Sequence, residues 1–196
     1  MGIADMMIPG YNPEKIQQNN HPEGWPTTFD KPVVGMERKG VFTDNMNVPL
    51  FGALAAIKNI RLKGHKLMII ADETGRSEKD VNHENEQLMK TFGEEGIHSI
   101  DGHLYSINTD TKDQFVKPNT SMFKRATEMV PSVKWSEGYY VGSTIIDMKT
   151  AIKIKAKPIF VNTNEHEFNK LNSHAHKSLL KQVTVVESLL EFAASL

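Results

Sequence analysis

The sequence predicts an α/β domain with a doubly wound parallel β-sheet, helices on both faces, and an extended N-terminal arm. From residue 41 onward, short apolar runs alternate with amphipathic stretches, which is typical of strand–helix–strand units. The apolar runs are too short and continuous for surface helices. The first 40 residues instead carry five of the nine prolines and show little periodicity, which favours extended chain.

Composition narrows the class of protein. The 196 residues suit one domain with an appended arm, and 39% hydrophobic with 24% charged residues is ordinary for a globular chain. The 23 basic and 24 acidic residues give a net charge of -1, so nucleic-acid binding is not indicated. The absence of cysteine excludes disulfides, thiolate zinc sites and a cysteine nucleophile.

Targeting signals are not expected. No apolar run approaches the roughly 20 residues of a membrane span, and the opening MGIADMMIPG lacks a basic, then apolar, signal peptide. We therefore expect a cytoplasmic protein or one within a viral or macromolecular assembly, neither secreted nor membrane-bound. Nineteen lysines against four arginines fit an AT-rich genome, such as that of many bacteria or their viruses, and a viral structural protein would suit a long arm.

The first strand is expected at 40–43, where GVFT is a short apolar run. A helix follows at 49–63, because Pro49 suits a first helical turn, apolar residues recur at helical spacing, and Gly64 ends the pattern. The second strand, KLMII at 66–70, is continuous and apolar, as in strands buried on both faces.

The middle of the chain begins with a polar helix at 78–93, which the hydroxyl of Ser77 can cap. GIHSI at 96–100 predicts the third strand, followed by a hairpin-like excursion and a polar loop to Gln114. Apolar residues at helical spacing then predict a helix at 120–130.

The last third of the chain alternates in the same way. Residues 164–178 there are interpreted as a polar surface loop. The expected elements are a strand at 138–142, a helix at 147–155, strands at 157–161 and 183–186, and a closing amphipathic helix at 187–196.

Ligands of an open parallel sheet bind at the carboxyl ends of its strands, so the loops there are the candidate site. Their carboxylates and one lysine would suit Mg²⁺ and a phosphate, because carboxylate oxygens are hard ligands and an ammonium offsets phosphate charge. The alternative is that these are ordinary polar turn residues. The candidates are Asp44, Asn45, Asn47, Asp72, Glu73, Thr74, Lys117, Ser143, Thr144 and Asp147.

Four loops that follow predicted strands or precede predicted helices resemble, in chain order, the four motifs of the haloacid dehalogenase-like (HAD) hydrolases. The resemblance is closest to the histidinol-phosphatase and heptose-bisphosphate-phosphatase branch. The first motif, Asp-x-Asp-Gly-Thr/Val after a strand, is matched to VFTDNMNV at 41–48. The second, Thr-Asn-Gln-Ser-Gly, is matched to ADETG at 71–75. The third is Lys-Pro at 117–118, and the fourth, Val-Gly-Asp-Ser-x-x-Asp, is matched to VGSTIID at 141–147. The resemblance implies a Rossmann-like core at 41–196. No full cap domain is expected, because the helix at Pro49 follows Asp44 directly and only about 40 residues separate Gly75 from Lys117.

The resemblance also implies roles for the matched residues. Asp44 takes the place of the nucleophile that forms an aspartyl-phosphate. Lys117 takes the place of the phosphate clamp, and Asp44 with Asp147 would hold Mg²⁺ if the metal is bound. The binding site would be completed by Asp72, Glu73, Thr74, Ser143 and Thr144.

Three departures from the motifs argue against catalysis. Met46 stands at the general acid, Ala71 at the phosphate-binding hydroxyl, and Ser143 at a metal-binding Asp. A general acid/base alone is worth about 10²–10⁴-fold in rate. The leading hypothesis is therefore a degenerate HAD-like protein, without phosphatase activity or cofactor, that acts as a structural or protein-interaction subunit.

Two alternatives stay open. One is a Mg²⁺-dependent phosphatase that uses Asp44, with Asp72 or Glu73 supplying the missing carboxylate. The other is a phosphate- or nucleotide-binding module without turnover. For the leading hypothesis, the contact element would be the arm at 1–40, which would bind a protein partner or a second copy. The anchors of this arm, Tyr11, Trp25 and Phe29, would alternatively pack on their own domain.

Overall fold

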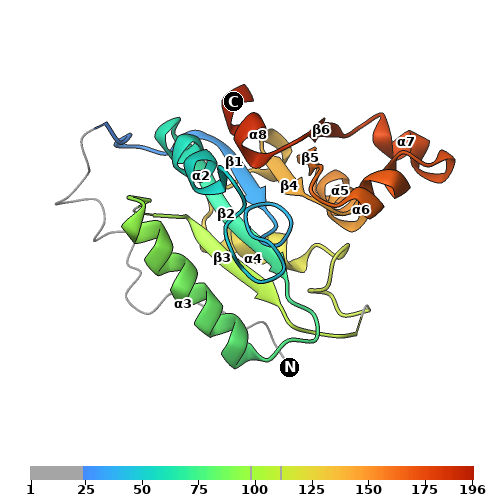
Figure 1. Ribbon diagram of the computed structural model, residues 1–196, viewed down its shortest axis with the longest axis horizontal. Helices are drawn as coiled ribbons and strands as arrows, with labels where there is room; N and C mark the ends of the chain where they lie inside the picture. The colour runs from blue at the N-terminus through green and yellow to red at the C-terminus, as the bar shows by residue number, and fades with distance from the viewer. Residues whose placement is uncertain (1–23, 98, 111) are drawn as a thin grey trace.

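The computed structural model describes residues 24–97, 99–110 and 112–196. One six-stranded sheet forms its centre, in the order β3-β2-β1-β4-β5-β6 (Figure 1). Every neighbouring pair is parallel, which confirms the predicted doubly wound fold class. The strands are β1 (Lys31–Met36), β2 (His65–Asp72), β3 (Gly102–Ser106), β4 (Tyr139–Gly142), β5 (Lys157–Val161) and β6 (Thr184–Val186).

Helices cover both faces of this sheet (Figure 1). On one face, α2, α3 and α8 share a core with Leu67 and Ile69 of β2. On the other face, α4 and part of α5 pack with Met68 and Ile70 of the same strand, because successive side chains of a strand point to opposite sides. The helices are α2 (Ala53–Leu62), α3 (Glu78–Glu94), α4 (Ser121–Met129), α5 (Ile145–Lys153), α6 (Glu165–Leu171), α7 (Lys177–Leu180) and α8 (Leu189–Ser195).

The first strand differs from the prediction. Residues 40–43 form a turn, in which the backbone N–H groups of Phe42 and Thr43 donate to the carbonyl of Arg38. Val41 and Phe42 are nevertheless buried, so the apolar run fills the core without joining the ladder. The first strand is β1, at the centre of the sheet between β2 and β4.

The core therefore begins at Lys31 and not at residue 41, and residues 31–40 do not belong to an arm. Pro32 and Gly35 interrupt the apolar run of β1, which made it look irregular in sequence. Residues 1–23 of the expected arm at 1–40, with its anchor Tyr11, lie outside the described residues. Of the other two anchors, Phe29 packs on the domain itself, where its ring lies 3.6 Å from the guanidinium carbon of Arg61.

Two further segments correct the prediction. Residues 96, 97, 99 and 100 are not in a strand; Ile97 and Ile100 are buried against the core. The third strand is β3, which pairs with β2. Within 164–178, α6 replaces the expected loop, and the side chain of Asn164 caps it by accepting from the N–H of Glu167.

Other predicted elements agree closely with the structure. Ser77 caps α3 as expected, because its hydroxyl accepts from the N–H of Asp80. The described chain between β1 and α4 contains only α2, β2, α3 and β3. No helix in the described ranges combines the length and apolar character that a membrane span requires.

Candidate functional site

Glu37 comes directly after β1, at the point where the strand order reverses, and its carboxylate joins three segments of the chain. Its Oε1 accepts a hydrogen bond from the N–H of Arg38 at 2.8 Å. Its Oε2 accepts from the N–H of Asp72, at the end of β2, at 3.1 Å. The same Oε2 contacts the ammonium group of Lys117. Glu37 is buried, so this carboxylate is largely shielded from solvent.

The ammonium group of Lys117 lies between two carboxylates. It donates to Oε2 of Glu37 and to Oδ1 of Asp147. It also lies 3.3 Å from the hydroxyl oxygen of Tyr140, which itself donates to the carbonyl of Ile70 at 2.9 Å. All three charged side chains are buried. The hydrogen bonds of Lys117 are thus made within the protein.

Asp147 is held by the beginning of α5. Its Oδ2 accepts from the N–H groups of Ser143 and Thr144, at 3.3 and 3.2 Å, and from the Thr144 hydroxyl at 2.8 Å. The Thr144 hydroxyl in turn accepts from the N–H of Asp147, which completes a capping box. The helix start therefore fixes the carboxylate that faces Lys117.

Gly40 and Ser143 bring the loops after β1 and β4 together. A Cβ on Gly40 would lie only 2.3 Å from Oγ of Ser143, and Gly40 has a positive φ of 74°. Only glycine meets both conditions without strain.

Burial and charge set the protonation of this cluster. Two carboxylates and one ammonium leave an excess negative charge away from water, which protonation of one carboxylate would remove. Burial raises the pKa of Glu37 to about 7, although Lys117 acts to lower it. For Lys117, burial acts to lower the pKa, but Asp147 and Glu37 outweigh it and hold the pKa well above its ordinary value. The lysine stays charged, and Glu37 is the group that titrates near neutral pH.

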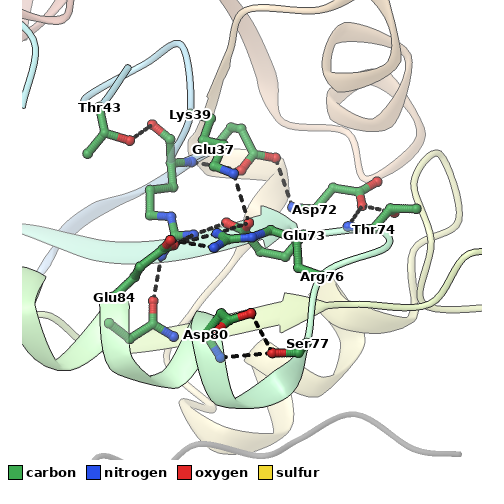
Figure 2. Close-up of polar contacts among 12 residues, drawn as sticks. Glu37, Lys39, Thr43, Asp72, Glu73, Thr74, Arg76, Ser77, Asp80 and Glu84 are labelled. Carbon is green, nitrogen blue, oxygen red and sulfur yellow. Dashed lines mark hydrogen bonds and ion pairs between the residues drawn. The ribbon is translucent and has the colours of Figure 1, made fainter. Parts of the chain in front are cut away.

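A second charged network lies beside the first, around Glu73 (Figure 2). The Glu73 carboxylate pairs with the buried guanidinium of Arg38, with Lys39 at 3.3 Å, and with Arg76 at 3.2 Å. Glu84 of α3 pairs with both arginines. These contacts tie the turn after β1 to α3 and to the loop after β2.

The structure brings some of the predicted site residues together. Lys117, Asp147, Ser143 and Thr144 meet beside Glu37, as described above. Asp72 contributes its backbone N–H, while its Oδ1 accepts from the N–H of Thr74 at 3.1 Å and from the Thr74 hydroxyl (Figure 2).

Neither proposed substitute carboxylate is bonded to Lys117. Glu73 is turned toward the arginines, and Asp72 closes a local turn with Thr74. Both predicted acid/base substitutes are thus occupied with other partners.

Asp44 is not where the sequence prediction placed it. It does not follow the first strand; it lies beyond the turn, and its Oδ1 accepts from the N–H groups of Met46 and Val48 at 2.8 and 2.9 Å. This carboxylate stabilises its own loop. Among the predicted metal ligands, only Asp147 belongs to the cluster around Lys117.

Glu37 is the residue that sequence reasoning missed. The first motif reads Asp-x-Asp-Gly-Thr/Val after a strand, and Glu37-Arg38-Lys39-Gly40-Val41 follows β1 with this spacing. Glu37 then stands at the first Asp and Lys39 at the second. The Gly-Val pair at 40–41 is the sequence feature that could have identified this motif. It was not recognised because residues 40–43 were interpreted as the first strand.

The donor set does not fit the Mg²⁺ ion that the resemblance implies. Mg²⁺ prefers octahedral oxygen coordination with carboxylates among its ligands. The two carboxylates that meet, Glu37 and Asp147, already share the ammonium of Lys117, and Lys39 adds a second ammonium on the turn after Glu37. No three His, Asp or Glu side chains gather into a metal-binding group within residues 24–97, 99–110 and 112–196.

Comparisons with known proteins agree on the fold. No protein-family model matches the chain, and no curated protein matches it in sequence. Among solved structures, it is similar to D,D-heptose 1,7-bisphosphate phosphatase from B. bronchiseptica, complexed with magnesium and phosphate. The TM-score is 0.71 at 15% identity, over 84% of this chain and 97% of that one.

Two other phosphatases give the same result. The D,D-heptose 1,7-bisphosphate phosphatase from Burkholderia thailandensis aligns with a TM-score of 0.60 at 16% identity, over 84% of this chain and 97% of that one. The p-nitrophenyl phosphatase from Archaeoglobus fulgidus aligns with a TM-score of 0.58 at 13% identity, over 85% and 100%. This chain therefore has the fold of HAD-type phosphatases.

Proposed function

We propose that this HAD-fold protein does not catalyse Mg²⁺-dependent phosphate hydrolysis and serves as a structural or protein-interaction subunit. The observation that carries the proposal is the buried cluster in which Lys117 joins Glu37 to Asp147. The ammonium of Lys117 contacts both carboxylates of the cluster, and Lys39 stands where the motif has its general acid. An ammonium that is paired with Glu73 is a poor replacement for a carboxylic acid that must donate and then accept a proton.

The state of Glu37 supports the same proposal. A carboxylate nucleophile must be ionised and must direct an oxygen at phosphorus. Both oxygens of Glu37 already accept hydrogen bonds from the protein, and its pKa of about 7 leaves it partly protonated at neutral pH. Loss of the general acid/base would lower the rate by a further factor of about 10²–10⁴.

An exposed apolar segment supports the interaction role. In the loop between the turn and α2, Met46 and Val48 are exposed and Phe51 is 99% exposed. Three large apolar side chains exposed in one loop offer a partner an apolar contact, as exposed apolar patches do at interaction sites. The N-terminal arm stays part of the proposal as a second contact element for a protein partner or another copy of the chain.

The test is phosphate release from a panel of phosphomonoesters with Mg²⁺, using the full chain beside Glu37→Gln and Asp44→Asn. We expect no turnover above that of Glu37→Gln. Turnover that is lost in Glu37→Gln and kept in Asp44→Asn would contradict the proposal. It would establish the alternative of a phosphatase, with Glu37 and not Asp44 at the nucleophile position.

A further inference from the structure

Three cationic side chains converge on the carboxylate of Glu73 (Figure 2). Its Oε1 contacts Nη2 of Arg38. Its Oε2 lies 3.3 Å from Nζ of Lys39 and 3.2 Å from Nη1 of Arg76. The Glu73 side chain is only 1% exposed, so these three groups take the place of solvent around the carboxylate. Charged donors that surround an oxyanion in this way form strong, charge-assisted hydrogen bonds, as they do in anion-binding sites.

Positive charges outnumber negative ones in this network. Arg38, Lys39 and Arg76 supply three cations, whereas Glu73 and Glu84 supply two carboxylates. The hydrogen bond from Arg76 lowers the pKa of Glu84, so the second carboxylate stays ionised. Without the carboxylate of Glu73, two positive charges would be left unbalanced, and a dianion would neutralise them.

The network is open to solvent on one side. Lys39, Arg76 and Glu84 are 28%, 24% and 22% exposed, whereas Arg38 and Glu73 are each 1% exposed. An anion could therefore reach the buried guanidinium from the side of Lys39 and Arg76. Glu73→Ala would remove the carboxylate and leave its space to a small oxyanion, whose further oxygen atoms could extend toward the open side.

We propose that Arg38, Lys39 and Arg76 form an oxyanion-binding site that the chain fills with its own Glu73. The ligand class that fits the site in place of Glu73 is a small dianion such as inorganic phosphate. In the parent chain the carboxylate is tethered to the site, so its effective concentration exceeds that of a free anion. The proposal goes beyond the structural or interaction role, because it means that the chain itself blocks phosphate binding at the loop after β2. It holds whether or not the protein hydrolyses phosphate.

The probe is inorganic phosphate, titrated at pH 8 into the full chain and into Glu73→Ala. The measurement is the melting temperature, with NaCl at equal ionic strength as the reference. We expect phosphate at ten times its Kd to raise the melting temperature of Glu73→Ala by about 3–6 °C. The parent chain, in which Glu73 fills the site, should show only the small general effect of phosphate on folded proteins.

Glu84→Ala is the matched control, because Glu84 contacts the same two arginines but its loss leaves Glu73 in the site. It should respond to phosphate no more than the parent chain does. Adding Arg76→Met to Glu73→Ala should abolish the response, since it removes one of the three cations. If Glu73→Ala does not fold in NaCl, phosphate should recover the folded state at an ionic strength at which NaCl does not.

Several outcomes would overturn the proposal. One is a failure of phosphate to stabilise or recover Glu73→Ala. Another is a rise of the same size in the parent chain or in Glu84→Ala, and a third is a response of Glu73→Ala that persists after Arg76→Met is added. Acetate that stabilises Glu73→Ala as strongly as phosphate would refute the dianion class, because a single negative charge would then be sufficient.

Discussion

The ammonium group of Lys117 contacts the carboxylate of Glu37, a residue 80 positions earlier in the chain. This contact joins the segment before α4 to the end of the central strand, and Asp147 completes it from the start of α5. Three segments that are distant in sequence therefore depend on one buried ammonium. The stability of the protein should respond strongly to its removal.

Lys117→Met should destabilise the fold by about 3–5 kcal/mol, because two carboxylates are then buried without their counter-charge. The measurement is urea unfolding at pH 7.5. Adding Glu37→Gln and Asp147→Asn to this variant should recover a large part of the loss. Lys134→Met, which removes an exposed pair with Glu137, should change stability by less than about 1 kcal/mol. Equal losses in the two lysine variants would contradict the role of the cluster.

Glu37 should make stability fall as pH rises toward neutrality. Its pKa is about 7 in the folded protein against an ordinary 4.5, so the folded state holds a proton that the unfolded state has released. The contribution is complete below pH 4.5 and is lost as pH rises through 7. Melting temperatures between pH 4.5 and 8 should show a smaller pH dependence in Glu37→Gln than in the parent chain. Matching pH profiles would refute the assignment.

Gly40→Ala should be more costly than an ordinary glycine replacement. The positive φ of 74° alone should cost about 1–2 kcal/mol, and the approach of the new Cβ to Ser143 adds about 1–3 kcal/mol. Gly75→Ala isolates the first effect, because φ there is 79° and the nearest atom lies at 3.9 Å. Combining Gly40→Ala with Ser143→Ala should cost less than the two single changes added together. Chemical denaturation of the four variants checks this.

Sequence patterns predicted helices and strands correctly where a local feature, such as a capping residue, coincides with the burial that the fold imposes. Ser77 and the apolar run at 66–70 predicted α3 and β2 closely, because a capping residue and a continuous apolar strand are local features. β1 was missed because Pro32 and Gly35 break its pattern, and its position depends on β2 and β4 pairing on either side. Strand formation here follows tertiary context more than local propensity.

The residues of the candidate site also differ in how far local sequence features indicate them. Lys117 and Asp147, which contact each other in the structure, could be singled out because a Lys-Pro pair and a helix start are visible in sequence. Glu37 was missed once the first strand was placed too late. The pairing of Arg38 with Glu73 and Glu84 joins residues 35 and 46 positions apart. Such contacts depend on how β1, β2 and α3 pack, and spacing along the chain does not reveal them.

Phe51→Ser tests the exposed apolar segment. Because Phe51 is 99% exposed, its loss should not destabilise the monomer, and unfolding should stay within about 0.5 kcal/mol of the parent. Association should fall if this segment forms a contact between copies. Light scattering after size-exclusion chromatography, over a range of concentrations, measures this directly. Leu62→Ser is the matched control at an exposed apolar residue of α2. An identical mass for the parent and both variants, in a parent that does self-associate, would exclude Phe51 from the contact.

Mg²⁺ should leave the thermal stability of the protein unchanged. A metal that binds only the folded state raises stability in proportion to the logarithm of its concentration above Kd. Because Lys117 already occupies the carboxylates of Glu37 and Asp147, MgCl₂ and NaCl at equal ionic strength should give the same melting temperature. Lys117→Met is the positive control: without the ammonium, the carboxylates of Glu37 and Asp147 are buried with no counter-charge, and Mg²⁺ should then stabilise that variant. A rise in the parent chain that disappears in Glu37→Gln would show that the metal site is intact, and the non-catalytic proposal would lose its main support.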